Sequence, residues 1–206
     1  YPNLPCEYPV VWVRPLEAAE LCAAQGKRLC DAHEWESACA GSLAASDADY
    51  DYAVDRREDA RRHNLHRQIV WAYGAERRVG ICATAAQKSP ACLDGGWEVC
   101  GSNTYPAGAF PKCISPLGVY DQHGNVAEIM NLPRAAAQLA SSQPKDEWRG
   151  LGETELKGSW FAFDPAVYHE DDCRWRAPSW HVSAISAPGG HHNYHLGFRC
   201  CRSLAP

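Results

Sequence analysis

The sequence predicts an α+β fold of irregular form, with short mixed strands, two helices and extensive disulfide-tied loops. Three observations favour this class. Eleven cysteines are spread along the 206 residues, which predicts several disulfides. Sixteen Gly and fourteen Pro interrupt the chain throughout, which favours loops between short elements. Eight Trp and nine Tyr provide the large side chains that pack such elements together.

Length and composition narrow the class of protein. A chain of 206 residues with 46% apolar side chains can bury the core of one large domain or of two small ones. No apolar run is long enough to span a bilayer. The net charge of −5 gives no electrostatic reason to expect nucleic acid or anionic lipid as a partner. Motifs typical of hydrolases, kinases and dinucleotide-binding enzymes are absent from the sequence.

The cysteines predict the compartment. They lack the paired C-x-x-C spacing of zinc sites, so we expect disulfides and an extracytoplasmic protein, secreted or periplasmic. An odd count predicts one unpaired thiol or one bridge to another chain, and the adjacent Cys200 and Cys201 are where we expect it. The chain starts at Tyr1 without a leader, so we expect that it follows processing or was cut from something longer.

The first elements are a strand and a helix. Residues 8–13 are apolar and predict a short strand. Pro15 suits the first turn of a helix, and residues 16–25 are rich in Ala, Leu and Glu. Gly26 is placed to close that helix.

A second helix follows directly. Asp31 and Glu34 have the spacing of a capping box, which predicts a helix as far as Gly41. This helix would present Trp35 and Cys39 on one face.

The middle of the chain is less regular. Residues 56–62 carry mixed charge and predict an exposed helix face. Cys82, Cys92 and Cys100 lie in loops that a small disulfide could hold. Residues 131–150 predict a loop on the surface.

The stretch from Gly118 to Glu128 combines a short apolar strand, a tight turn and two carboxylates. Gly124 and Asn125 tolerate the positive φ of such a turn. The carboxylates of Asp121 and Glu128 and the carbonyls between them are the hard oxygens that Ca²⁺ prefers. The alternative is a solvated turn without an ion.

The residues from Gly26 to Glu36 are similar to a known family. Gly26-Lys-Arg-Leu29, then Asp31 and Glu34-Trp-Glu36, resembles the G-K-R-L-P-T-E-A-E-W-E segment of the formylglycine-generating enzyme (FGE) family, also called the sulfatase-modifying-factor family. Cys30 replaces the proline. Six further segments resemble motifs of the family: Trp71–Gly74, Tyr105–Pro111, Gly118–Glu128, Leu156–Trp160, Cys173–Arg176 and His195–Cys200.

The resemblance implies one domain over residues 1–206 with the family's irregular fold, which is related to C-type lectins. The opening strands of the family have no counterpart before Tyr1. We therefore expect either that the chain is a fragment or that another chain completes it.

The resemblance also implies a set of calcium ligands. These are the side chains of Asp121 and Glu128 and the carbonyls of Gly124 and Val126. The tryptophans that usually flank the glutamate are replaced here by Ala127 and Ile129, so the neighbouring groove and its ligand should differ.

Two disulfides are implied by the resemblance, Cys22 with Cys200 and Cys39 with Cys173, and Cys201 is the alternative partner of Cys22. If Cys22 pairs with Cys200, the resemblance implies no partner for the remaining cysteines: Cys6, Cys30, Cys82, Cys92, Cys100, Cys113 and Cys201.

The copper site of the family is not present in this sequence. FGEs hold copper with two cysteines five residues apart, just after the strand that matches Leu156–Trp160. One alignment puts the two positions at Ala162 and Val167, and the other puts them at Phe163 and Tyr168. Neither contains a cysteine, so we do not expect oxidation of cysteine to formylglycine.

Histidines are concentrated in the same region. Two imidazoles from His191 and His195, with a third from His169 or His181, would suit Cu, Fe or Zn. If residues 191–195 are extended, His191 and His195 point to the same side. Acidic residues 170–172 are further candidate ligands, and the alternative is a polar loop without metal.

Two functions remain. The first is a calcium-stabilised module that binds a protein or peptide, in a groove to which we expect four residues to contribute: Trp160, Asp164, Trp175 and Arg176. The second is an extracytoplasmic oxidoreductase with a non-thiolate Cu or Fe site, acting on a peptide or a small molecule.

Overall fold

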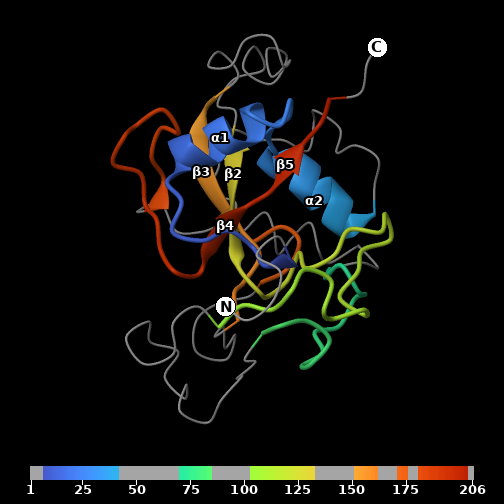
Figure 1. The fold of residues 1–206 in the computed structure, drawn as a ribbon. Helices are drawn as coiled ribbons and strands as arrows, with labels where there is room; N and C mark the ends of the chain where they lie inside the picture. The colour runs from blue at the N-terminus through green and yellow to red at the C-terminus, as the bar shows by residue number, and fades with distance from the viewer. Residues whose placement is uncertain are drawn as a thin grey trace.

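The computed structural model describes residues 7–41, 70–84, 103–132, 151–161, 171–175 and 181–203. The elements in these ranges, in chain order, are α1 (Pro15–Ala23), β1 (Arg28–Leu29), α2 (Ala32–Ala40), β2 (Ala127–Leu132), β3 (Glu153–Lys157), β4 (Leu196–Phe198) and β5 (Cys200–Cys201) (Figure 1). The predicted α+β class, with short mixed strands, is confirmed.

Both helices begin and end close to the residues that the sequence predicts. Pro15 is in the first turn of α1, which ends two residues earlier than expected. The Asp31 side chain accepts a hydrogen bond from the Glu34 N–H at 2.9 Å, and the Glu34 carboxylate accepts one from the Asp31 N–H at 3.1 Å. This capping box starts α2, and Gly41 with φ 76° ends it.

The strands form two small sheets. In the larger sheet the order is β3-β2-β4, with β3 antiparallel and β4 parallel to β2. Glu128 in β2 is opposite Lys157 on one side and Gly197 on the other. In the smaller sheet β1 and β5 are antiparallel. The end of the chain therefore adds one strand to each sheet.

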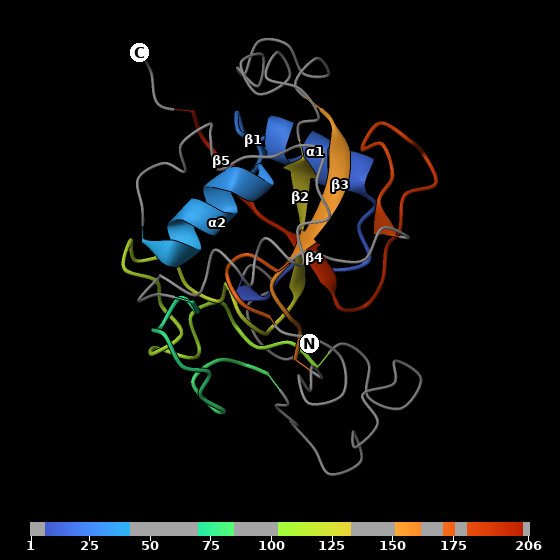
Figure 2. The same ribbon diagram turned by 180° about the vertical axis from the view of Figure 1, so that it is seen from behind.

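β2 is the centre of the core, because all six of its residues are buried. Ile129 belongs to the apolar cluster that includes α1, whereas Met130 belongs to the cluster that includes α2. Alternate side chains of a strand point to opposite faces. The two helices therefore cover opposite faces of β2, which is why α1 is nearer the viewer in Figure 1 and α2 in Figure 2.

Four disulfides tie these elements together. They are Cys22–Cys200, Cys30–Cys201, Cys39–Cys173 and Cys82–Cys113. The first and third are the pairs that the family resemblance implies. Cys200 and Cys201 both have partners, so the expectation of an unpaired thiol there is wrong. Cys6, Cys92 and Cys100 lie outside the described residues.

Three predicted elements differ from the structure. Residues 8–13 form no strand, because Pro9 lacks an N–H and Trp12 has a φ of 64°, which breaks an extended run. Tyr120 makes only an isolated bridge with Ile114. The predicted surface loop 131–150 starts too early, because Asn131 and Leu132 are buried in β2. Residues 133–150 and 56–62 lie outside the described ranges.

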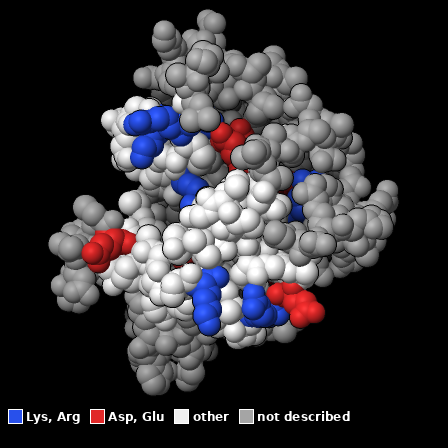
Figure 3. Space-filling model, turned by 90° about the vertical axis from the view of Figure 1, so that its right-hand side faces the viewer, with Lys and Arg blue, Asp and Glu red and all other residues white. Residues whose placement is uncertain are grey.

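Neither described helix has the length or apolar character needed to cross a bilayer, since each has nine residues. On the face in Figure 3, the described acidic and basic side chains are interspersed around a largely uncharged centre. This distribution agrees with the modest net charge of the chain.

Candidate functional site

The turn inside residues 118–128 depends on residues with positive φ. Gly124 has φ 77°, and a Cβ atom there would lie 2.5 Å from the backbone carbonyl of Ala83. Asn125 has φ 64°, and its side-chain amide bonds both the N–H and the carbonyl of Tyr105. Residues 83, 105 and 124 are thereby held together, and the turn is tightly packed.

Glu128 is buried just beyond this turn. Its carboxylate accepts a hydrogen bond from the Trp35 indole at 3.0 Å and two from the Arg199 guanidinium at 2.6 and 2.8 Å. The side chain thus joins α2, β2 and the segment between β4 and β5. Its charge is compensated by Arg199 in a bidentate pair.

Asp121, the other predicted calcium carboxylate, accepts a hydrogen bond from the Gly108 N–H at 2.7 Å. Burial raises its pKa, and the negative charge of Glu128 raises it further. A cation near both carboxylates would relieve this repulsion. The oxygen donor set suits Ca²⁺, but Arg199 already supplies positive charge to Glu128, so Asp121 is the less engaged of the two carboxylates.

The structure brings together three of the four predicted metal-binding histidines. The rings of His181 and His191 are 4.8 Å apart. His195 stacks on Trp160 with 4.7 Å between ring centroids. Burial lowers the pKa of His195 to about 4, and the charges of His191 and His181 act in the same direction.

The Nδ1 atom of His195 is buried and has no hydrogen-bond partner among the described residues. The nitrogen atoms of the three histidines do not converge on one point in their present rotamers, because they are not within 4.8 Å of one another. His169 lies outside the described ranges. The cluster therefore offers two nearby imidazoles and one unused buried nitrogen.

The other side of the same loop forms an aromatic surface. His192 and Tyr194 pack against Trp12, with ring centroids 6.0 and 6.3 Å from the indole. Trp12 is 42% exposed, and its backbone N–H donates a hydrogen bond to the Asn193 carbonyl. Residues 194 and 195 form a turn rather than the extended chain considered above, and the Tyr194 ring also contacts His195 with 4.9 Å between ring centroids. We call Trp12, His192 and Tyr194 the aromatic ridge.

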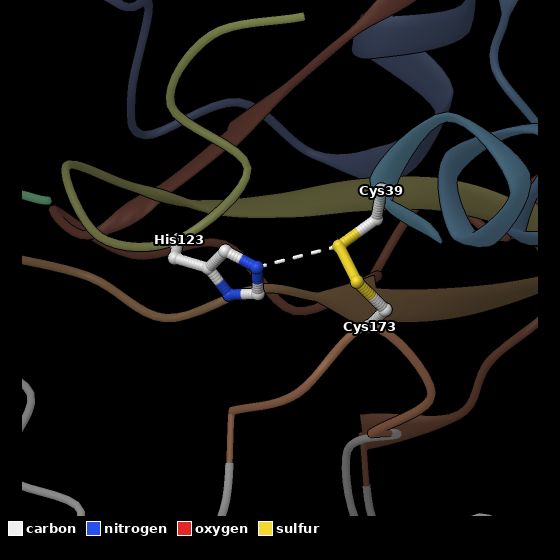
Figure 4. A group of neighbouring side chains, drawn as sticks. All are labelled: Cys39, His123 and Cys173. Carbon is white, nitrogen blue, oxygen red and sulfur yellow. Dashed lines mark hydrogen bonds between the residues drawn. A yellow bond between two sulfur atoms is a disulfide. The ribbon is translucent and has the colours of Figure 1, made fainter. Parts of the chain in front are cut away.

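A separate cluster lies beneath α2. Figure 4 shows the imidazole of His123 directed at the Cys39–Cys173 disulfide, with Nε2 3.3 Å from the Cys39 sulfur. All three side chains are buried. Nε2 also accepts a hydrogen bond from the Ala72 N–H at 3.0 Å, so the ring proton is on Nδ1. Burial lowers the pKa of His123, which keeps the ring neutral.

Asp171 faces the other side of that imidazole. Its Oδ2 lies 4.0 Å from Nδ1 of His123 and accepts a hydrogen bond from the Ser159 hydroxyl at 2.8 Å. Its Oδ1 accepts one from the Trp71 indole at 3.0 Å. Arg77 is 3.9 Å away and balances the charge. Sequence reasoning missed His123 and Asp171 as partners, because residues 39, 123 and 171 are too far apart in sequence for any motif.

The remaining predicted groove residues are only partly described. The Trp175 carbonyl accepts a hydrogen bond from Lys157, whose ammonium also contacts Glu36 at 2.5 Å. Lys157 is fully buried where the family motif has glycine, and sequence reasoning gave it no role. Several predicted positions lie outside the described residues: Asp164, Arg176, and the copper positions Ala162, Phe163, Val167 and Tyr168.

These features define a class of protein: an α+β domain in which disulfides tie two helices to the C-terminal strands and loops carry the candidate sites. Comparison with known proteins gives the family. The sulfatase-modifying factor enzyme 1-like domain matches residues 4–204. The chain therefore belongs to the FGE-sulfatase family, as its motifs indicate.

One solved structure shows the fold independently. PvdO from Pseudomonas aeruginosa superposes with a TM-score of 0.53 and 18% sequence identity. The alignment covers 99% of this chain and 65% of the PvdO chain. At this identity the likeness shows the fold alone. No curated protein matches the sequence.

Proposed function

We propose that this chain is an extracytoplasmic binding module of the FGE family without formylglycine-generating activity, and that its ligand is a peptide segment of another protein. The observation that carries the proposal is the aromatic ridge. The Trp12 side chain is exposed, and its backbone is held in a left-handed conformation. Backbone strain of this kind is concentrated at functional positions. Exposed Trp and Tyr side chains are enriched at binding surfaces.

Peptides selected from a random library on the wild-type protein test this proposal. The matched control is Leu21→Ala in α1, because Leu21 is 43% exposed and Trp12 is 42% exposed. Trp12→Ala should weaken binding of the selected peptides by about tenfold or more, the effect of losing an interface anchor. Leu21→Ala should leave binding unchanged. Equal binding by both variants, or no selected peptide, would contradict the proposal.

The absence of formylglycine-generating activity rests on residue identity. The family's pair of copper-binding cysteines aligns with Ala162 and Val167 in one alignment and with Phe163 and Tyr168 in the other. Without soft thiolate ligands, Cu(I) has no matching site there. The purified protein, incubated with copper and a cysteine-containing sulfatase peptide, should produce no aldehyde. Detection of formylglycine by mass spectrometry would refute this part.

The disulfides support the proposed compartment. Eight cysteines form four bridges in the described part of the chain, and such a density is typical of proteins in oxidising surroundings. Cell fractionation with thiol labelling tests the location. Recovery of the protein in the cytosol with free thiols would contradict it.

We also propose that calcium stabilises the turn at Asp121, with the carbonyls of Gly124 and Val126 and the carboxylate of Glu128 as further ligands. Support comes from the repulsion between the two carboxylates, which a cation would reduce. Glu128→Ala would also break the ion pair with Arg199, so Asp121→Asn is the cleaner variant. Calcium should raise the melting temperature of the wild type but not of Asp121→Asn. A wild type that is insensitive to calcium would rule the site out.

The second candidate function is a metal-dependent oxidoreductase. It is favoured by the proximity of His181 and His191 and by the unused buried nitrogen of His195. Metal analysis separates the candidates: stoichiometric copper or iron should be lost in His191→Ala and His195→Ala but kept in His192→Ala, whose ring contacts Trp12 instead. A copper-free and iron-free protein that binds peptide would eliminate the enzyme.

A further inference from the structure

The buried cluster of Cys39, His123 and Cys173 has no part in the proposed function. One residue comes from α2, one from the turn before β2 and one from the segment 171–175. Their potential ligand atoms all lie within 4.8 Å of one another. At present the two sulfurs form a disulfide, so the cluster cannot bind a metal in this oxidation state.

The unprotonated nitrogen of the imidazole lies next to the disulfide. Nε2 is 3.3 Å from the Cys39 sulfur and accepts a hydrogen bond from the Ala72 N–H, so a zinc ion would take over this lone pair from Ala72. Nδ1 therefore carries the proton. It is fully buried, has no hydrogen-bond partner among the described residues, and faces the Asp171 carboxylate at 4.0 Å. A buried N–H without a partner is unfavourable, so a closer approach of the Asp171 carboxylate would stabilise this tautomer.

An imidazole with a carboxylate behind one nitrogen and soft ligands before the other is the usual arrangement at zinc sites, where the carboxylate orients the ring. Two sulfurs and one imidazole suit Zn²⁺, and two thiolates would balance its charge. The Asp171 charge is balanced separately by Arg77 at 3.9 Å.

We propose that the Cys39–Cys173 disulfide is a latent metal site: when it is reduced, the two thiolates and Nε2 of His123 bind one zinc ion, with Asp171 positioning the imidazole. In reduction by a dithiol, the S–S bond breaks, the dithiol becomes a cyclic disulfide, and its two protons and two electrons pass to the cysteines. Zinc binding then releases the two thiol protons. The metal takes over the role of the covalent bond in holding α2 to residues 171–175.

The other disulfides provide a contrast within the same molecule. Cys82–Cys113 belongs to no such cluster among the described residues. Cys30–Cys201 has the carboxylate of Glu34 nearby, but Arg28 already binds that carboxylate. Cys82 and Cys113 are therefore the internal control for the Cys39–Cys173 pair.

Differential alkylation of the wild-type chain tests the proposal without any substitution. The protein is reduced with a trialkylphosphine, which takes its oxygen from water, and is then alkylated with and without zinc. Zinc should slow the alkylation of Cys39 and Cys173 by about tenfold or more, because a thiolate that is bound to the metal is a poorer nucleophile than a free one. Cys82 and Cys113 should react at the same rate in both samples. Equal protection of all cysteines, or of none, would overturn the proposal.

Zinc affinities of the reduced variants then test the roles of the two side chains. Asp171→Asn should weaken zinc binding by about 10–100-fold, the usual effect of removing a supporting carboxylate. His123→Leu should weaken it more, and His123→Cys should restore it by supplying a third thiolate. Unchanged affinity in both Asp171→Asn and His123→Leu, with native circular dichroism, would show that zinc binds thiols elsewhere.

Discussion

At the residue scale, Gly124 shows how backbone conformation fixes the central turn. Its φ of 77° is in the left-handed region, and the carbonyl group of Ala83 fills the space where a side chain would lie. Gly26 has a similar φ of 65°, but nothing lies within 4 Å of its missing Cβ. A side chain at Gly26 would therefore cause only backbone strain, whereas a side chain at Gly124 would cause the same strain and also overlap with Ala83.

Substitution of these glycines by alanine should have unequal effects. Gly26→Ala should lower the free energy of unfolding by about 1–2 kcal/mol, the cost of a left-handed residue. Gly124→Ala should lower it by about 1–3 kcal/mol more, because the backbone of residue 83 must move. Chemical denaturation of both variants measures the difference. Equal losses would show that the contact with Ala83 is easily relaxed.

Asp31 predicts a pH dependence. Burial, and then the charge of Glu34, raises its pKa to about 6. A carboxyl whose pKa is higher in the folded state contributes stability below its unfolded pKa of about 3.9, and this is lost as the pH rises through about 6. Asp31→Asn keeps an acceptor for the Glu34 N–H but does not titrate. The wild type should therefore lose stability relative to Asp31→Asn between pH 4 and pH 7, as followed by denaturation at each pH. A constant difference would contradict the raised pKa.

At the scale of elements, the two-residue strand β5 is held by two disulfides. Cys22–Cys200 connects it to α1, and Cys30–Cys201 connects it to the residue after β1. The two bridges close loops of nearly the same length, with separations of 178 and 171 residues. In the loop-entropy model, either bridge supplies most of the closure that the other would give.

Removal of the two bridges should therefore be non-additive. Replacing either pair with alanine should cost about 2–3 kcal/mol, because the remaining bridge keeps the long loop closed. Replacing both pairs should cost more than the sum of the two single losses. Denaturation of the three variants provides the double-mutant cycle. Additive losses would show that the bridges act through local packing instead.

At the scale of the whole molecule, the central position of β2 joins two apolar clusters into one folding unit. Ile129 and Met130 are adjacent in sequence and both fully buried, but they belong to different clusters. Because the same strand serves both faces, neither α1 nor α2 can lose its packing surface while the other keeps an intact β2.

This arrangement predicts cooperative unfolding. Ile129→Ala and Met130→Ala should each lower the free energy of unfolding by about 2–5 kcal/mol. In both variants, tryptophan fluorescence and far-ultraviolet circular dichroism should report the same transition. Separate transitions in the two signals would show that the clusters unfold independently.

Several local features were predictable from the sequence because neighbouring residues determine them. The capping box of Asp31 and Glu34, the closing Gly26 and the turn at Gly124 depend on local backbone chemistry. The conformation of residues 8–13 was not predictable in this way. Their apolar side chains favour a strand and carry no information about the positive φ of Trp12. That conformation accompanies the contact of Trp12 with residues 192–194.

By itself, the sequence determined the α+β class, the family motifs and the lack of cysteines at the copper positions, because residue identity and local pattern are sufficient for these. Only the tertiary structure decided which distant side chains meet. It placed Arg199 against Glu128, His181 beside His191, and His123 between Asp171 and the Cys39–Cys173 disulfide. These contacts join residues far apart in the chain, and packing around β2, which no local pattern encodes, sets their distances.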